Sequence, residues 1–470
     1  MDWVFFLMAA LAALMVFGLI IHLVSIFSSE GDNNDGFFGK LIIVVSFTLV
    51  SYNLLMLPYS VAALQYAALI PESKSNVLLL WTIVAVALVI FGLVICPFVL
   101  VYHEVGNHNN SNAWKRVCVS VAMTLLVVVL ASSAFYCGWH FAGYANVGYT
   151  AYSTSIQPVT SFESIKEFSD QSQGESLRLQ VSLFVYLIAL LCAAGWIPLC
   201  TFGGIGLVAV PQEFLLYFRD RPRPITASEY AYRREEVARE SQRLIDKGRM
   251  IEETSAEHSY GGHARKVLAF RQAVRELEAY HTTLEISYHQ QGGKVLQGYL
   301  CLLAGLVFTF LSIRWILYIT LSNVSDTHPM YGGMLRQLSD TSLTLCVTVY
   351  SCFAFYLLCC TIKGCIKLGG NLALYHIYPV EVNKTLTTSF LFNAILCIIT
   401  SSAVLNLCAD SFPVYAVNSD VSVLFSVFVA NLAVVKYVVS YTPYFLVVVS
   451  CLALMWLIVS PRRYARVSRW

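Results

Sequence analysis

The chain has 470 residues, of which 57% are hydrophobic and only 12% are charged, and its formal net charge is +2. About a quarter of the residues of an ordinary soluble domain are charged, so a single soluble globule is excluded. The near balance of acids and bases also argues against a nucleic-acid surface, and we expect no nucleic-acid partner. The solvent that suits this composition is the lipid bilayer.

Nine apolar runs are long enough to cross a bilayer, which takes roughly 20 residues each. The first run carries Asp2 rather than a basic n-region and exceeds the length of a signal-peptide core, so we expect it to stay as a signal anchor. The predicted spans are 3–27, 41–69, 77–102, 116–138, 181–217, 296–320, 341–362, 385–409 and 440–460.

A tenth apolar run, 421–435, is shorter and is followed by Lys436. If it also crossed, the basic tail with Arg462 and Arg463 would lie opposite the charged insert described next, against the positive-inside rule. We therefore expect this run to be re-entrant or interfacial. With nine spans, the positive-inside rule places the N-terminus on the external or lumenal side and the C-terminus in the cytoplasm. We expect the membrane to be the plasma membrane or an endolysosomal membrane.

Charge gathers between Phe218 and Lys294, which hold close to half of the 30 lysines and arginines together with almost as many acids. Arg221-Pro222-Arg223-Pro224 separates this insert from the fifth span, because a helix does not run through such a sequence. Thr226 or Ser228 can then cap a helix over about 229–257. Ser259-Tyr260-Gly261-Gly262 is predicted to break it, and a second helix is predicted over about 263–290.

Each of these two helices carries an apolar stripe. On the first helix the residues that recur every seven are Tyr230, Val237, Leu244 and Ile251. On the second the steps alternate between three and four, which is typical of a coiled coil. The stripes fit an antiparallel cytoplasmic hairpin. Either the hairpin packs only on itself, or it is a docking surface for a cytosolic protein over 225–292. The docking candidates are Val267, Phe270, Val274, Leu277 and Leu284.

The expected fold is therefore an all-α polytopic membrane protein with nine transmembrane helices and one cytoplasmic helical hairpin. The predicted domains are a five-span membrane domain over 1–217, the hairpin over 218–294, and a four-span membrane domain with the 421–435 segment and a basic tail over 295–470. A homodimer is a further candidate assembly.

Polar residues inside the spans are the candidates for a ligand site or pathway. Asn53, Pro58 and Gln65 make the second span a kinked, partly polar helix, which is how transporters build sites near the midplane, although helix packing explains the same pattern. Arg314 is the one charge deep in a span. It either snorkels to the headgroups, pairs with an acid such as Asp340, or contacts a ligand.

Two further groups lie in the fifth and eighth spans. Gly203, Gly204 and Gly206 allow close approach to the backbone, either by a neighbouring helix or by a ligand. Ser389 and Asn393 lie one turn apart and face the same way, so they either hydrogen-bond to another span or line a polar pathway.

Other patterns suggest modification rather than chemistry. Asn323 begins a glycosylation triplet in a loop predicted to face outward. Cys359, Cys360 and Cys365 lie at a cytoplasmic span end, where reversible acylation occurs and plain packing is the alternative. The 14 cysteines form no ligand-spaced cluster, so neither a metal nor a cofactor is expected. Without paired carboxylates in the spans or a phosphate-binding loop, an enzyme is the least supported class.

Several short motifs are shared with a known family of membrane proteins. They are the run from Gly203 to Pro211, Phe218, Arg221-Pro222, Ile225-Thr226, Glu229-Tyr230, Phe355-Tyr356-Leu357-Leu358, Ile377-Tyr378-Pro379, the run from Thr387 to Asn393, Cys408 and Lys436-Tyr437. In these residues the chain resembles the limb-region membrane protein family, which includes the lipocalin-interacting membrane receptor and the lysosomal cobalamin exporter. The likeness is strongest to the plant-type branch, and it covers the second half better than the first four spans. The resemblance implies nine spans, an external N-terminus and a central cytoplasmic loop.

Two functions follow from the pattern and the resemblance. One is a receptor or transporter for a small apolar ligand or its carrier protein. The alternative is a membrane scaffold or signalling protein that acts through the cytoplasmic hairpin. A transporter requires a cavity lined by the second, fifth, sixth and eighth spans, whereas a scaffold requires tightly packed spans and an exposed apolar stripe on the hairpin.

Overall fold

The computed structural model describes residues 2–27, 36–69, 77–108, 113–150, 174–254, 260–289, 295–321, 330–369, 387–417 and 419–459. Eight described helical segments are long and apolar enough to cross a membrane. Helix α1 (Asp2–Phe27) adds a shorter apolar stretch, Leu14–Phe27, because its earlier side chains are not described. The expected class, an all-α polytopic membrane protein, is confirmed, and the eight segments coincide with eight of the nine predicted spans.

Two of the crossings are not continuous α-helices. Helix α3 (Val77–Ile90) continues through a π-helical turn, η2 (Phe91–Ile95), into α4 (Cys96–His108). Helix α7 (Leu183–Pro198) continues through η3 (Leu199–Gly203) into α8 (Gly204–Arg219). Pro198 has no N–H to donate to the carbonyl four residues earlier, so the backbone hydrogen bonds of the helix are interrupted next to the start of η3. The other described segments long and apolar enough to cross a membrane lie in α2 (Gly36–Leu69), α5 (Ala113–Ala142), α11 (Val295–Leu321), α13 (Leu343–Gly369), α14 (Thr387–Ser411) and α17 (Val435–Val459).

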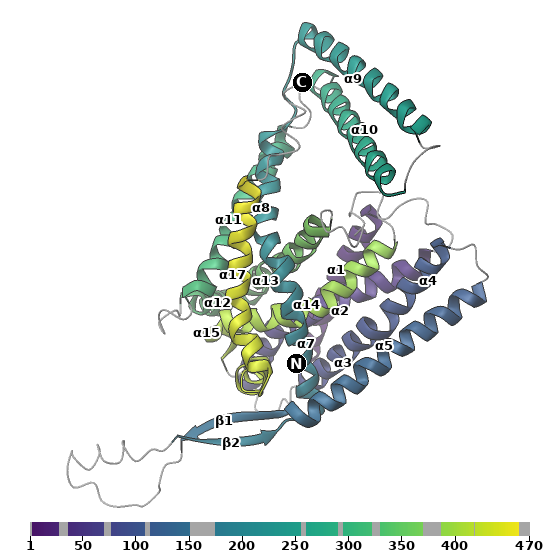
Figure 1. Ribbon diagram of the computed structural model, residues 1–470. Helices are drawn as coiled ribbons and strands as arrows, with labels where there is room; N and C mark the ends of the chain where they lie inside the picture. The colour runs from purple at the N-terminus through teal and green to yellow at the C-terminus, as the bar shows by residue number, and fades with distance from the viewer. Residues whose placement is uncertain are drawn as a thin grey trace, which may run out of the picture. The chain divides into compact units, whose positions relative to one another are not determined.

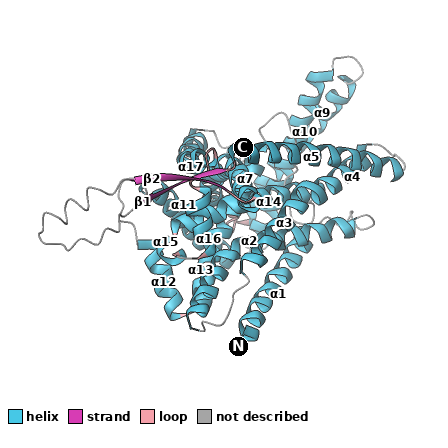
Figure 2. Ribbon diagram, turned by 90° about the horizontal axis from the view of Figure 1, so that it is seen from below, coloured by secondary structure: helices cyan, strands magenta, loops and turns pink. Residues whose placement is uncertain are grey.

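The chain divides into two compact units. Unit 1 comprises Met1–Ala209 and Ile313–Cys451, and unit 2 comprises Val210–Ser312 and Leu452–Trp470. The centre of unit 1 is α14, which packs against α2, α7, α13 and α4 (Figures 1 and 2). A short helix, α12 (Met330–Thr341), packs against α13 and against the single turn α15 (Pro413–Ala416). Helix α14 is thus the axis of the unit.

A β-hairpin joins α5 to α7, although the expected fold was all-α (Figure 1). Strands β1 (Tyr144–Thr150) and β2 (Gly174–Gln180) pair antiparallel, with Tyr144 opposite Gln180. The signal was the alternation of Leu177 and Leu179 with polar neighbours, which has the period of a strand. At its base the Asn146 N–H donates to the Asn431 carbonyl at 3.1 Å.

The segment predicted to be re-entrant or interfacial is helical over α16 (Asp420–Val423) and a π-helical stretch, η4 (Leu424–Val429). These residues make about 15 Å of helix at 1.5 Å per residue, half of the roughly 30 Å of a hydrocarbon core. Phe425 packs on Trp81 of α3, with ring centroids 6.0 Å apart. The helix is therefore too short to cross, and its depth in the bilayer stays a prediction.

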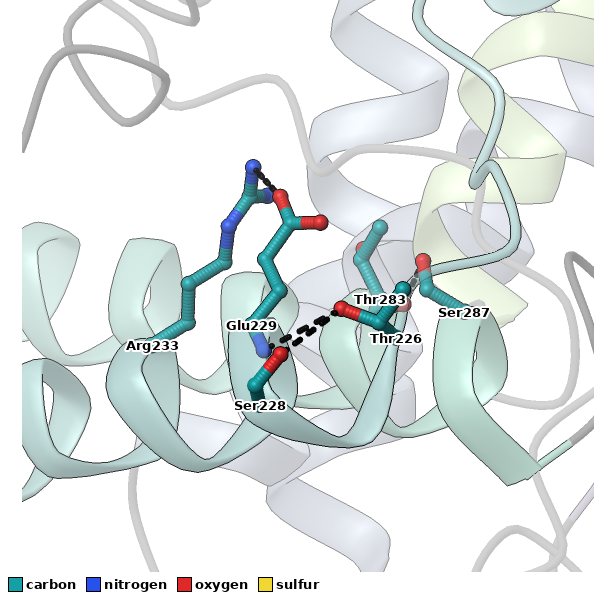
Figure 3. Close-up of polar contacts among 6 residues, drawn as sticks. All are labelled: Thr226, Ser228, Glu229, Arg233, Thr283 and Ser287. Atoms are coloured by element: carbon teal, nitrogen blue, oxygen red, sulfur yellow. Dashed lines mark hydrogen bonds and ion pairs between the residues drawn. The ribbon is translucent and has the colours of Figure 1, made fainter.

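In unit 2 the insert forms two helices, α9 (Ala227–Thr254) and α10 (Tyr260–His289), which pack on each other. Figure 3 shows the start of α9, where the Glu229 N–H donates to the Thr226 Oγ1 at 3.4 Å and Arg233 donates to the Glu229 carboxylate at 2.6 Å. A break between the two helices was predicted over Ser259–Gly262. Helix α10 begins at Tyr260, so that prediction was wrong for residues 260–262, and both glycines lie in the first turn of α10.

Candidate functional site

The candidate site is the polar core around α14. This helix is buried along nearly its whole length, yet many of its residues are polar rather than aliphatic. Polar groups away from water need partners, so each hydroxyl and amide here either bonds its own helix, bonds a neighbour or awaits a ligand. The buried polar residues are Thr387, Ser389, Asn393, Thr400, Ser401, Ser402, Asn406 and Ser411.

Asn53 joins α2 to this core. Its Nδ2 donates to the Ser401 hydroxyl of α14 at 2.9 Å, and Ser401 donates in turn to the Ile398 carbonyl at 2.9 Å. Both side chains are buried. The predicted polar face of the second span is therefore real at Asn53, and in this structure it serves a contact between helices.

Pro58 leaves a backbone carbonyl of α2 without its helical donor. Residue 58 has no N–H, so the Leu54 carbonyl four residues earlier loses its usual partner. The Tyr350 hydroxyl of α13 donates to that carbonyl at 3.0 Å. Tyr350 was missed from the sequence, although asking which group replaces the missing Pro58 donor would have led to a hydroxyl on a neighbouring span.

Among the described residues of α14, Asn393 has a buried acceptor without a hydrogen-bond partner. Its Nδ2 donates to the Ser389 carbonyl at 2.8 Å within α14, while its Oδ1 is buried and accepts no hydrogen bond from a described residue. The predicted pair Ser389 and Asn393 therefore lies together inside the bundle. A neutral donor on a ligand would satisfy this oxygen.

The three predicted glycines lie where helices touch. A Cβ atom on Gly206 would overlap the backbone of Cys360 in α13. On Gly204 it would lie 3.0 Å from the Leu446 carbonyl oxygen of α17, and on Gly203 it would lie 3.4 Å from the Thr361 hydroxyl. All three contacts are helix packing, which was one of the two alternatives. Gly364, missed from the sequence, makes the reciprocal close approach to Phe202.

Arg314 and Gln65 lie outside the α14 core. The Arg314 side chain is 8% exposed, with its guanidinium 5.2 Å from the Phe353 ring centroid, so it does not fit the snorkelling hypothesis. One turn along α11, the Tyr318 hydroxyl donates to the Asp410 carbonyl at 2.7 Å. Gln65 is exposed and donates to the Ser339 hydroxyl of α12 at 3.2 Å.

Of the three acylation candidates, Cys360 and Cys365 are fully buried and Cys359 is exposed. An acyl transferase needs an accessible thiol, so the structure restricts the acylation hypothesis to Cys359.

No three His, Cys, Asp or Glu side chains gather as metal ligands within the described ranges. Outside the crossings, burial raises the pKa of the Tyr415 hydroxyl well above its ordinary value, so it stays neutral. Asn323 lies outside the described residues.

The docking candidates of the insert lie along the seam of the hairpin. Leu284 is buried, as are Val237 and Leu244 of α9, while Phe270, Val274 and Leu277 are partly buried. A Cβ on Gly248 of α9 would lie 3.0 Å from the Phe270 ring, so Phe270 packs across the seam. The described candidates thus face the other helix, and the side chain of Val267 lies outside the description.

The chain is similar in sequence to a family of membrane proteins. The sequence profile of the family described as LMBR1-like membrane protein matches residues 5–276. A LIMR family protein of Dictyostelium discoideum is 27% identical over 463 residues, covering 89% of each chain. LIMR family proteins of Arabidopsis thaliana and Oryza sativa subsp. japonica are 25% and 26% identical, and each alignment covers 93% of this chain and 91% of the relative.

No solved structure matches this chain. The match to the family profile covers the first four spans of this chain. The resemblance therefore extends further toward the N-terminus than expected, since it was expected to lie mainly in the second half. Plant relatives are among the matches, as the resemblance implied. The chain belongs to the LMBR1-like membrane protein family.

Proposed function

We propose that this protein is a receptor or transporter for a small, largely apolar ligand, free or delivered by a carrier protein. The observation that supports the proposal is the open Oδ1 of Asn393 on a central polar helix surrounded by interrupted ones. Pro58 removes one backbone hydrogen bond from α2, and π-helical turns interrupt the crossings that contain η2 and η3. Interrupted helices around a polar centre are typical of membrane sites for small ligands.

The chemistry of the core favours an uncharged ligand. Among the described residues, Arg314 is the one charged side chain in the buried set, and the remaining polar groups are hydroxyls and amides. A charged ligand would need an opposite charge or several donors inside the bilayer. A ligand with one or two hydrogen-bonding groups and a large apolar surface suits these side chains.

The scaffold alternative has less support. Its predicted docking stripe lies in the seam between α9 and α10. The large apolar side chains that the described part of α9 exposes are Tyr232, Ile245 and Met250. Tyr232 and Met250 share a face but are 18 residues, about 27 Å, apart, and Ile245 lies on another face, so the three do not form one continuous docking stripe.

The test is binding and uptake by the purified full-length protein in liposomes, with a panel of small neutral apolar compounds. We expect Asn393→Ala to weaken binding several-fold, because it removes the open acceptor. Ser411→Ala is the matched control, since that buried hydroxyl already donates to the Leu407 carbonyl of its own helix. If no compound binds or crosses, the proposal fails.

We also propose that the N-terminus lies outside or in the lumen and that the α9–α10 hairpin and the C-terminus lie in the cytoplasm. An odd number of crossings and the concentration of basic residues in the insert support this orientation. Protease added to intact cells should leave α9 and α10 uncut and should cut them after permeabilisation. Cleavage in intact cells would contradict the proposed topology.

A further inference from the structure

Arg221 lies where two candidate membrane spans meet the charged insert. Helix α8 ends at Arg219, two residues before it, and α11 begins at Val295. Both helices belong to apolar segments long enough to cross a bilayer. The ends of such segments lie at the level of the lipid headgroups, where arginine and tyrosine side chains concentrate.

The Arg221 side chain is held in place by aromatic rings of α8 and α11. Its guanidinium lies 4.2 Å from the Phe218 ring centroid and 5.0 Å from the Tyr299 ring centroid. Gly298 makes room for it, since a Cβ atom there would lie 3.3 Å from the Arg221 Cδ. Stacking uses the faces of a guanidinium and leaves its in-plane donors for an anion.

No acid neutralises this arginine within the part of the chain that the structure describes. Asp220 accepts from the Arg219 Nε at 2.7 Å and from its Nη2 at 3.0 Å. The Arg221 Nη1 is covered and makes no hydrogen bond to a described residue, while the side chain as a whole is partly exposed. With Asp220 matched to Arg219, Arg221 and the exposed Arg223 leave a local positive charge.

An apolar stripe runs along α11 from this point. Leu296, Leu300 and Leu303 are each more than half exposed, and their spacing of four and three residues puts them on one face with Tyr299. These residues offer acyl chains a surface beside a fixed arginine. A free phosphate ion would have no use for that stripe, whereas a phospholipid would cover it.

We propose that Arg221 binds the phosphate of an anionic phospholipid, with the acyl chains along the Leu296–Leu303 face of α11. Because Nη1 is covered, the edge formed by Nε and Nη2 is the one that can present two parallel N–H groups to the phosphate oxygens. Phe218 and Tyr299 fix its orientation, so little side-chain freedom is lost on binding. This inference does not depend on the ligand proposed for the α14 core.

The experiment measures phosphatidylserine and phosphatidylcholine, with identical acyl chains, retained by the purified full-length protein in native mass spectrometry. The wild-type protein should prefer phosphatidylserine. Arg221→Gln should weaken phosphatidylserine binding about fivefold, because the direct contact of one held guanidinium with the lipid phosphate is lost. It should weaken phosphatidylcholine binding less, because choline offsets the charge of the same phosphate group. Arg223→Gln removes the same charge from an exposed side chain that no ring of the described residues holds in place, and should change binding less than twofold, because that side chain is not preorganised for one phosphate.

Two more variants separate stacking from charge. Tyr299→Leu keeps the charge and removes one aromatic ring. Arg221→Lys keeps the charge and removes the planar guanidinium. Each should weaken phosphatidylserine binding by less than Arg221→Gln does. They also test the proposal if Arg221→Gln does not fold, which its melting temperature in phosphatidylcholine will show.

Three outcomes would overturn the inference. Equal losses in Arg221→Gln and Arg223→Gln would mean diffuse attraction by the whole basic segment. Displacement of phosphatidylserine by millimolar inorganic phosphate would mean a site for free phosphate. Wild-type affinity in both Tyr299→Leu and Arg221→Lys would mean that the aromatic clamp has no role.

Discussion

The α14 bundle and the α9–α10 hairpin are both helical, but different forces hold them together. In the bundle, neighbouring helices meet through backbone contacts at glycines and through single buried hydrogen bonds such as Asn53 to Ser401. In the hairpin, an apolar seam with Val237, Leu244 and Leu284 excludes water, and charged pairs cover the outside. Lipid supplies no hydrophobic force between apolar helices, so the bundle depends on close packing and polar contacts, whereas water drives the hairpin together.

The largest expected effect tests backbone contact in the bundle. Gly206→Ala puts a Cβ atom into the backbone of Cys360, which cannot move without shifting α13. We expect a loss of about 3 kcal/mol or more in stability, seen as a lower melting temperature and yield of the full-length protein. Gly18→Ala is the control, because a Cβ atom there meets nothing within 4 Å. A wild-type melting temperature for Gly206→Ala would refute the proposed close contact.

The next effect tests the apolar seam of the hairpin. Leu244→Ala removes a side chain that is 8% exposed, and we expect a loss of about 2 to 3 kcal/mol in local stability from the cavity. Hydrogen exchange of the α9 and α10 amides would report it. Ile245→Ala, one residue along, truncates a side chain that is 47% exposed and should have a much smaller effect. Equal effects would show that the seam does not stabilise the hairpin.

A smaller effect tests the bond that replaces the missing proline donor. Tyr350→Phe leaves the Leu54 carbonyl without its hydroxyl donor and should lower the free energy of unfolding by about 1 kcal/mol, as for other hydrogen bonds between membrane helices. Adding Pro58→Ala restores an N–H at residue 58, so Tyr350→Phe should then have less effect. Additive effects in this double-mutant cycle would contradict the explanation.

The smallest effect concerns the surface charges of the hairpin. Arg239 and Glu235 lie 3.0 Å apart with each side chain 67% exposed, so Arg239→Gln should cost less than about 0.5 kcal/mol. The loss should shrink further in high salt, measured by hydrogen exchange of α9. A loss above 1 kcal/mol would mean that charge, rather than the apolar seam, holds the hairpin.

Several features of the candidate site followed from the residue types. Asn53, Ser389 and Asn393 were identified because amides and hydroxyls are rare inside apolar runs, and all three are buried on α2 and α14. Gln65 was selected by the same argument and lies exposed instead, since the sequence does not show which face of a span points inward. Tyr350 was missed because its role depends on a proline nearly 300 residues earlier in the chain.

The sequence by itself determined the membrane class, the positions of eight crossings and the apolar stripes of the insert, because span length and helical periodicity are local properties. Only the tertiary structure decided which groups meet. Asn53 and Ser401 are 348 residues apart, and Tyr350 and Leu54 are 296 residues apart. Their pairing depends on how α2, α13 and α14 pack, and a polar residue in an apolar run does not identify its partner.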